Sequence, residues 1–328
     1  MSKIITLGEL LIDLTQQGTD ENGNGKFVAY PGGAPANVAV AASRLGAETA
    51  FIGKVGDDAF GRSLADTLQK DNVDISGLYY SETTPTTMAI VSVDENGERD
   101  FSFYRKPGAD IMLTGDESVS AVRKHADKGA RILHIGSLSM TDSPAREACI
   151  AAVELAKEKG MLISYDPNYR AALWDSEEQA VSEMKSLLPY ADILKVSDEE
   201  LLMLSGTDDF EKGSAILQTM GRGADDEGIS LIMVTLGADG VFVRSSTGSC
   251  CAAVPGFKVK VADTNGAGDT FLGAMLAQIV KNESILFNLG WDALIDMVRY
   301  ANRAASITCS RHGAIPAMPR AEELSSAQ

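Results

Sequence analysis

Runs of apolar residues typical of short β-strands alternate along the chain with segments whose apolar positions recur at helical spacing. The strand-like runs are apolar almost throughout, as a parallel sheet covered on both faces requires. This alternation predicts an α/β fold, in which a doubly wound, mostly parallel sheet is flanked by helices. The strand-like runs are residues 4–8, 49–53, 132–136, 162–166, 193–197 and 231–237, and the helical patterns include residues 37–45, 61–69, 145–159 and 180–188.

Two segments depart from this alternation. Residues 88–93 and 99–104 are strand-like and flank a polar stretch, 94–98, whose Asn-Gly pair is typical of a β-hairpin turn. Residues 15–30 are polar, rich in glycine and loop-like, with one strand-like run at 26–30. We expect the two segments to form a small antiparallel sheet that projects from the main one.

The chain is acidic, with a formal net charge of −17 over 328 residues. Nucleic acids and anionic membranes bind clustered lysine and arginine, so neither is an expected partner. The N-terminal residues lack the apolar core of a signal peptide, and no run has the length of a membrane span. The four cysteines include no CxxC pair, and the three histidines are scattered. We therefore expect a cytoplasmic protein with reduced thiols and without a catalytic transition metal.

The run Asp263-Thr-Asn-Gly-Ala-Gly-Asp269-Thr leads directly into an apolar, helix-forming segment. Backbone N–H groups at the start of a helix have no partner within the helix, and the helix dipole makes that end positive. The turn therefore suits an anion, and Asp269 adds an acid–base group beside it. Together they indicate phosphoryl transfer to a hydroxyl group. The structural alternative is a tight turn before a helix, in which Asp269 serves only as a cap.

A second glycine-rich turn, Gly32-Gly-Ala-Pro-Ala-Asn37, opens the alanine-rich helix near the N-terminus. Its glycines allow the backbone to approach a ligand closely, and the Asn37 amide both donates and accepts hydrogen bonds. Asp13 follows an apolar run, where its carboxylate can accept hydrogen bonds from two sugar hydroxyls. A tight turn with a capping asparagine, and a carboxylate at the surface, are the structural alternatives. Several predicted strands also become polar at their C-terminal ends, where open α/β sheets bind ligands.

The two glycine boxes, in this order and at this separation, resemble the two signatures of the ribokinase-like (PfkB) sugar kinases. The resemblance extends over residues 3–319. It implies one domain over residues 1–328, with a ribokinase-like fold and a small β-sheet lid formed by insertions at about 14–32 and 86–107. In relatives the lid often forms a dimer contact, so a homodimer through the lid is also implied. Stretches similar to the fructokinase branch are residues 8–13, 51–61, 103–110 and 166–170.

The resemblance assigns roles to individual residues. Asp269 matches the catalytic base, which takes the proton of the attacking hydroxyl, and Gly266, Ala267 and Gly268 match the anion hole for the transferring phosphoryl group. The implied sugar-binding residues are Asp13, Gly32, Gly33, Asn37, Arg105 and Arg170. The implied ATP-binding residues are Asn168, Lys195, Thr235, Gly237, Gly240 and Asn302. Taken alone, the turn 235–240 could be an ordinary hairpin and Asn302 an exposed helical residue.

ATP as co-substrate implies Mg²⁺, which keeps several waters and bridges phosphates. Many family members have Asn-x-x-Glu where this chain has Ser197-Asp-Glu-Glu200, a variation shared with fructokinase relatives. Glu200 is then the expected Mg²⁺ contact, through water, with Glu199 as an alternative. A monovalent cation, usually K⁺ in relatives, is expected beside Asp263, Asn265 and Gly313.

These assignments predict an ATP-dependent kinase that phosphorylates D-fructose at the 6-hydroxyl group to give fructose 6-phosphate. Its partners would be two small molecules, the sugar and ATP. One alternative is another kinase of the family, acting on 2-keto-3-deoxygluconate, ribose or aminoimidazole riboside. A second is a non-catalytic relative that binds a sugar or a protein. An NAD-dependent oxidoreductase is disfavoured because residues 8–11 do not supply the required G-x-G-x-x-G turn.

Overall fold

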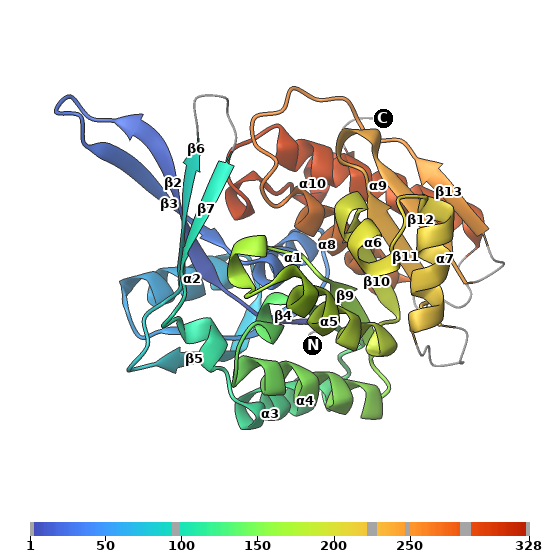
Figure 1. The fold of residues 1–328 in the computed structure, drawn as a ribbon, viewed down its shortest axis with the longest axis horizontal. Helices are drawn as coiled ribbons and strands as arrows, with labels where there is room; N and C mark the ends of the chain where they lie inside the picture. The colour runs from blue at the N-terminus through green and yellow to red at the C-terminus, as the bar shows by residue number, and fades with distance from the viewer. Residues whose placement is uncertain (1–2, 94–98, 222–227, 247–249, 283–289, 326–328) are drawn as a thin grey trace.

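The large sheet of the protein has nine strands in the order β13-β12-β11-β10-β9-β8-β1-β4-β5 (Figure 1). The structure is a computed structural model, and it describes residues 3–93, 99–221, 228–246, 250–282 and 290–325. Strands β11, β10, β9, β8, β1, β4 and β5 run parallel to one another. Strands β12 and β13 pair in antiparallel fashion at the β11 edge. The strands are β1 (Ile4–Leu7), β4 (Thr49–Gly56), β5 (Asp74–Ser81), β8 (Ile132–Gly136), β9 (Leu162–Asp166), β10 (Ile193–Ser197), β11 (Leu231–Thr235), β12 (Val241–Ser245) and β13 (Cys250–Val254).

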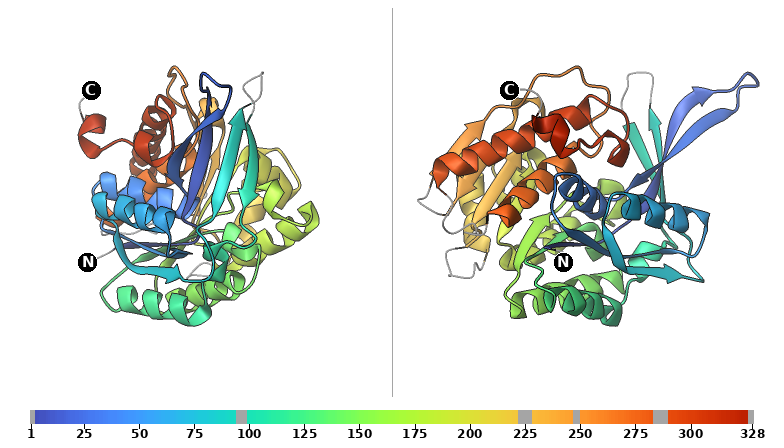
Figure 2. Two further views of the ribbon diagram at one scale, coloured as in Figure 1. Left: turned by 90° about the vertical axis from the view of Figure 1, so that its left-hand side faces the viewer. Right: turned by 180° about the vertical axis from the view of Figure 1, so that it is seen from behind.

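Helices cover both faces of this sheet, which confirms the predicted α/β fold. The helices α1, α2, α8 and α9 lie on one face, the near side in the right-hand view of Figure 2, and α3 to α7 lie on the other. Because both faces are covered, the central strands bury the side chains on each side. The helices are α1 (Ala34–Arg44), α2 (Ala59–Lys70), α3 (Gly115–Ala126), α4 (Ala145–Glu158), α5 (Glu177–Leu187), α6 (Asp198–Ser205), α7 (Phe210–Met220), α8 (Ala267–Lys281), α9 (Trp291–Cys309) and α10 (Ala321–Ser325).

Helices α1 and α8 pack together closely because both are lined by small residues. A methyl group placed on Gly273 of α8 would lie 2.6 Å from the Cβ atom of Ala41 in α1. Each helix follows a glycine with a positive φ angle, Gly33 (φ 108°) before α1 and Gly266 (φ 74°) before α8. Such angles are costly for residues with a Cβ atom. The two glycine-rich turns of the sequence therefore open two neighbouring helices.

A second, four-stranded sheet in the order β3-β2-β6-β7 extends beyond the edge of the core (Figure 1). Its strands are β2 (Leu11–Thr19), β3 (Gly25–Gly32), β6 (Met88–Val93) and β7 (Arg99–Tyr104). The predicted hairpin strands pair as β6 and β7, and the predicted turn at 94–98 lies outside the described residues. We call this sheet the lid.

Two expectations about the lid were wrong. Residues 15–30, expected to be mostly loop, form the larger parts of β2 and β3, and the polar pattern misled because most side chains of β3 are exposed. The sheet is also not purely antiparallel, since β2 pairs with β6 in parallel. Strand β2 begins at Leu11, directly after β1, so the chain passes from the large sheet into the lid almost without a break.

One region brings together the carboxyl ends of β1, β9 and β10, the starts of α1 and α8, and the base of the lid. The chemistry expected from the sequence is concentrated in this region. In the described part of the chain, no helix combines the length and apolar character that crossing a membrane would demand.

Candidate active site

A hydrogen bond joins the two glycine boxes, although they are far apart in the sequence. Asn37 Nδ2, in the first turn of α1, donates to Asp269 Oδ2, in the first turn of α8, over 2.8 Å. Both side chains are buried. The Asp269 carboxylate therefore faces another helix, which a simple cap of α8 does not explain.

Burial raises the pKa of Asp269 to about 6. The hydrogen bond from Asn37 opposes this rise, because it stabilises the ionised form, whereas the charge of Asp166 adds to it. Lys195 and Arg170 also favour ionisation of Asp269. The carboxylate is consequently ionised at neutral pH, with a pKa close enough to 7 to accept a proton in a reaction.

Asp269 lines a cavity of about 340 Å³ at the N-terminus of α8. The N–H groups of Gly268 and Asp269 lie in the first helical turn, where the helix offers no acceptor. Ala267 differs from the rest of the predicted anion hole, because its N–H donates to Thr264 O across the turn, over 3.3 Å. The other lining residues are Asn168, Tyr169, Arg170, Lys195, Ser197, Glu199, Glu200, Thr264, Asn265 and Gly266.

Lys195 supplies a buried positive charge to this cavity. Its Nζ atom lies 2.9 Å from Asp166 Oδ2. Burial acts to lower the pKa of Lys195, but Asp166 and Glu200 outweigh burial and raise it. A methyl group on Gly268 would lie 3.1 Å from Lys195 Nζ, so the ammonium group sits directly against the anion-binding turn. Lys195 and the start of α8 therefore present positive charge to the same space.

Glu200 is held by the backbone on both of its carboxylate oxygens. Oε1 accepts the N–H of Tyr169 over 2.7 Å, and Oε2 accepts the N–H of Ser197 over 2.8 Å. Ser197 in turn caps α6 through its side chain, so the departure from the family's asparagine gives a capping box. Burial raises the pKa of Glu200, and Lys195 opposes that rise. Glu199, the alternative expected from the sequence, is exposed and also lines the cavity.

The predicted sugar-binding residues near the N-terminus lie close to Asp269. Asp13, within β2, is buried, and the side chain of Asn265 lies 3.5 Å from its Oδ2 atom. Burial raises the pKa of Asp13 to about 6, and Arg170 lowers it. A methyl group on Gly32 would lie 2.4 Å from Asp13 Oδ2, so the turn and the carboxylate are in contact. Arg170 is exposed, and its charge reaches both Asp13 and Asp269.

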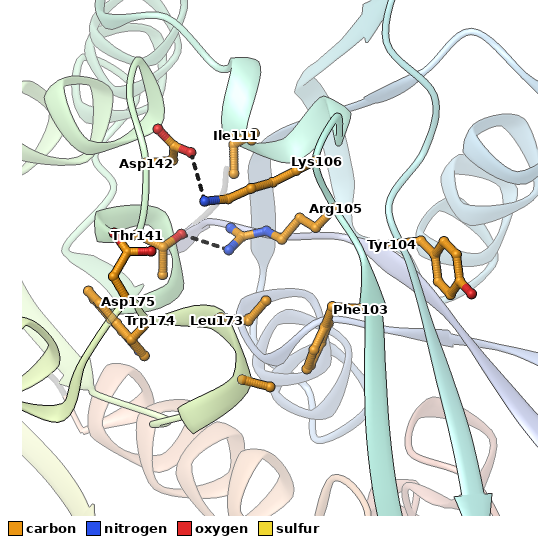
Figure 3. A pocket seen from close by; sticks show the side chains of 11 residues that line it. Phe103, Tyr104, Arg105, Lys106, Ile111, Thr141, Asp142, Leu173, Trp174 and Asp175 are labelled. Atoms are coloured by element: carbon orange, nitrogen blue, oxygen red, sulfur yellow. Dashed lines mark hydrogen bonds and ion pairs between the residues drawn. The ribbon is translucent and has the colours of Figure 1, made fainter.

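Arg105 occupies a separate place. It directly follows β7, and it lines a second cavity of about 340 Å³ at the base of the lid (Figure 3). The loop 168–175 borders both cavities, because Asn168 lines the one that contains Asp269 and Asp175 lines the one that contains Arg105. The prediction that Arg105 contacts the sugar stays a prediction.

Two of the residues expected to bind ATP, Gly240 and Asn302, contact the segment 254–256 at the end of β13. Asn302 is buried and donates from Nδ2 to Val254 O over 3.3 Å and to Pro255 O over 3.1 Å, so the exposed-residue alternative is wrong. A methyl group on Gly240 would lie 2.2 Å from Val254 O. Thr235 and Gly237 belong to the same turn, which connects β11 and β12 as a hairpin. Asn168 and Lys195, by contrast, line the cavity that contains Asp269.

Asp263 organises the loop before α8. Its Oδ1 atom accepts the N–H of Asn265 over 2.7 Å, and its Oδ2 atom accepts the N–H of Gly313 over 3.0 Å. These three residues, expected near a monovalent cation, are thus neighbours. Within the described ranges, no group of three or more His, Cys, Asp or Glu side chains is arranged to hold a metal ion.

Two buried acidic residues of this region were not assigned from the sequence. Asp166 pairs with Lys195, and Glu9 accepts the N–H of Ala34, at the start of α1, through Oε1 over 2.8 Å. In the sequence, each of these residues lies at the end of an apolar run. That position indicated the strand ends where ligands bind, but it did not indicate which groups Asp166 and Glu9 contact.

The chain matches the pfkB family of carbohydrate kinases over residues 1–321. It is 42% identical to fructokinase-1 of Zea mays over 326 residues, which cover 98% of this chain and 96% of that protein. Among solved structures, the fructokinase with bound ATP from Xylella fastidiosa is 33% identical with a TM-score of 0.87, and the match covers 99% of this chain and 98% of that one.

A fructokinase double mutant from Vibrio cholerae O395, solved with fructose, ADP and a potassium ion, is also similar. It is 33% identical with a TM-score of 0.84, and the match covers 99% of this chain and 98% of that one. The Asn37–Asp269 pair at the start of α8 lies within the matched residues. This chain belongs to the pfkB family of carbohydrate kinases.

Proposed function

We propose that the protein is a fructokinase, which transfers the γ-phosphoryl group of ATP to the 6-hydroxyl group of D-fructose. The observation that carries the proposal is the Asn37–Asp269 pair, which sets a carboxylate with a raised pKa at a helix N-terminus. The three similar proteins named above match nearly the whole chain and are fructokinases, which supports fructose over the other sugars of the family.

In the proposed reaction, Asp269 accepts the proton of the 6-hydroxyl group while that oxygen forms its bond to the γ-phosphorus. The bond between this phosphorus and the oxygen of the leaving ADP breaks. The N–H groups at the start of α8 and the Lys195 ammonium face the negative charge that builds on the transferred group. The free backbone donors of the site suit a reaction that depends on positioning and charge stabilisation more than on a strong base.

Mg²⁺ is the proposed metal, and when bound with ATP it neutralises phosphate charge. The described residues form no closed metal site, which agrees with an ion carried mainly by phosphates and waters. Glu200 has both oxygens engaged by backbone N–H groups, so we propose that it reaches the ion through water. Exposed Glu199 remains the alternative. Removal of Mg²⁺ with EDTA should abolish turnover, and turnover that persists would contradict this proposal.

A monovalent cation beside Asp263, Asn265 and Gly313 is proposed as well. Both Asp263 oxygens accept backbone N–H groups and thereby hold the loop in shape. We therefore propose that backbone carbonyl oxygens of this loop bind the monovalent cation. Replacing K⁺ by tetramethylammonium in the assay should lower kcat.

We also propose a cytoplasmic enzyme. All four cysteines lie in the described residues and are free of disulfides, and fractionation of the producing cells would test this location.

A homodimer through the lid is proposed because β3 exposes Phe27 (48%) and Val28 (40%). Phe27→Lys should shift the sedimentation coefficient from that of a dimer to that of a monomer, because a charge would enter the apolar contact. Leu202→Lys is the matched control, since Leu202 is equally exposed (48%) but lies on α6, away from the lid. A wild-type protein that sediments as a monomer would contradict the dimer.

The substrate assignment predicts that fructose has the highest kcat/KM in a panel of sugars with saturating ATP and Mg²⁺. The panel should contain ribose, 2-keto-3-deoxygluconate and aminoimidazole riboside, and the product should be identified as the 6-phosphate. Faster turnover of any of these three would remove fructose as the substrate. Saturable fructose binding without any phosphorylation would favour the non-catalytic alternative.

Asp269→Asn should lower kcat by about 10²–10⁴-fold, the usual contribution of a general base. The KM for fructose should change little, because the amide keeps the size of the side chain and can still form hydrogen bonds. Asp116→Asn is the control, as Asp116 also lies in the first turn of a helix but is exposed on α3. Wild-type turnover in Asp269→Asn would exclude Asp269 as the base.

The hydrogen bond from Asn37 predicts a pH effect. Asp269 must be ionised to accept a proton, so kcat/KM should fall as pH decreases through its pKa of about 6. In Asn37→Ala the carboxylate loses a donor that stabilises its ionised form, so its pKa rises and the acidic limb of kcat/KM moves to higher pH. Asn22→Ala, on the exposed part of the lid, should leave the limb in place. An unchanged limb in Asn37→Ala would contradict the proposed role of this bond.

A further inference from the structure

The positive charge of Arg105 is fully engaged within the protein. Its guanidinium group is buried, and Nε donates to Asp110 Oδ2 over 2.7 Å. Nη1 donates to Thr141 Oγ1 over 2.7 Å, and Nη2 donates to the carbonyl oxygen of Leu138 over 2.9 Å (Figure 3 shows the bond to Thr141). All three nitrogens of the fork therefore have acceptors already, and the charge has a carboxylate partner.

A second hydrogen bond, on the oxygen that does not contact Arg105, holds Asp110 in place. It lies in the short 3₁₀ helix Ala109–Met112, and its other oxygen, Oδ1, accepts the hydroxyl of Thr87 over 2.5 Å. The side chains of the pair are only 5% and 2% exposed. A methyl group on Gly108 would lie 2.3 Å from Thr87 Oγ1, so the backbone also packs tightly here. Neither partner can turn away without leaving a buried charge unpaired, which is costly.

A second carboxylate, Glu9, faces the same pair. Its charge interacts with Arg105 and with Asp110. Its Oε1 atom accepts the N–H of Ala34, and its Oε2 atom has no hydrogen-bond partner among the described residues. Burial raises the pKa of Glu9 to about 7. Two buried carboxyl groups, Asp110 and Glu9, thus interact with the guanidinium group of Arg105. The net charge of this cluster is neutral or negative, depending on whether Glu9 is ionised.

This cluster adjoins the turn that is predicted to bind the sugar. The first turn of α1 contacts Glu9 through Ala34 and Asp269 through Asn37. The cavity lined by Arg105 lies between the base of the lid and the loop 168–175. In Figure 3, Phe103 points into this cavity and Tyr104 points away from it.

The second cation in the lining of this cavity is also paired. Lys106 Nζ lies 3.5 Å from Asp142 Oδ2, in an ion pair whose side chains are 70% and 40% exposed. Asp175 adds a further carboxylate to the wall. Among the described residues that line the cavity, each cation therefore has an acidic partner.

We infer that Asp110 is a specificity-determining residue, which occupies Arg105 so that the enzyme accepts neutral sugars and rejects sugar acids. A sugar carboxylate at this end of the site would meet Glu9 and could pair with Arg105 only by displacing Asp110. Rejection through an unfavourable charge contact is a common source of specificity. The inference rests on the proposed sugar kinase activity, and it adds why 2-keto-3-deoxygluconate, the charged alternative, should be a poor substrate.

The test compares kcat/KM for fructose with kcat/KM for 2-keto-3-deoxygluconate in Asp110→Asn. The substitution keeps the shape of the side chain and removes the charge that neutralises Arg105. We expect the ratio of the two values to fall by about tenfold or more, equivalent to about 1.4 kcal/mol. Adding Glu9→Gln should lower the ratio further, because the second carboxylate is then removed too. Asp110→Glu, which retains the charge, should keep the preference for fructose.

Asp142→Asn is the matched control, since it removes the carboxylate partner of Lys106 from the same cavity. It should leave the ratio within about twofold, because an exposed ion pair contributes little. The inference is overturned if Asp110→Asn leaves the ratio unchanged. It is also overturned if Asp142→Asn lowers the ratio equally, since the total charge of the cavity would then set the selectivity.

Wild-type protein provides a test that does not depend on the folding of a variant. With fructose as substrate, a neutral polyol should inhibit competitively more strongly than the matching sugar acid, for example glucitol compared with gluconate. Equal or stronger inhibition by the acid would overturn the inference. Failure of the proposed function is distinguishable, because no sugar in the panel would then be phosphorylated. A preference for a neutral sugar other than fructose would correct the substrate and leave the inference standing.

Discussion

The structure depends on the close approach of α1 and α8. Each helix begins at a glycine with a positive φ angle, and small residues at their interface bring the two N-termini together. The hydrogen bond between Asn37 and Asp269 is possible only at this separation. It connects a turn suited to a sugar with a turn suited to a phosphoryl group. Asp13 of the lid and the loop residues 168–170 then border this junction.

The site contains several buried charges, and each is stabilised differently. Lys195 is stabilised by Asp166, Glu200 by backbone N–H groups, and Arg105 by Asp110. Asp269, Asp13 and Glu9 have raised pKa values because burial outweighs their partners. Burial also raises the pKa of Glu200, although both of its oxygens accept backbone N–H groups, so a raised pKa alone does not mark a reactive carboxylate in this region. Asp269 is distinguished by its position, because it lies in the first turn of α8 and lines the cavity there.

The sequence predicted the α/β core because parallel strands buried on both faces are apolar throughout, as in 162–166 and 193–197. It predicted the Asp269 turn because glycines before an apolar helix have a clear pattern. The strands β2 and β3 were obscured, since strands whose side chains are largely exposed need few apolar residues. Pairings such as Asp166 with Lys195 and Glu9 with Ala34 depend on tertiary contacts that no local spacing reports.

The contact between Gly273 and Ala41 has a consequence for how this protein can vary. A larger side chain at either position would push α8 away from α1 and move the carboxylate of Asp269 from the Asn37 amide. Such a change could still leave a folded chain, because the large sheet and its opposite helices do not involve this contact. Natural variation at residue 273, about one turn of helix after Asp269, is thus expected to be limited by catalytic geometry before it is limited by folding.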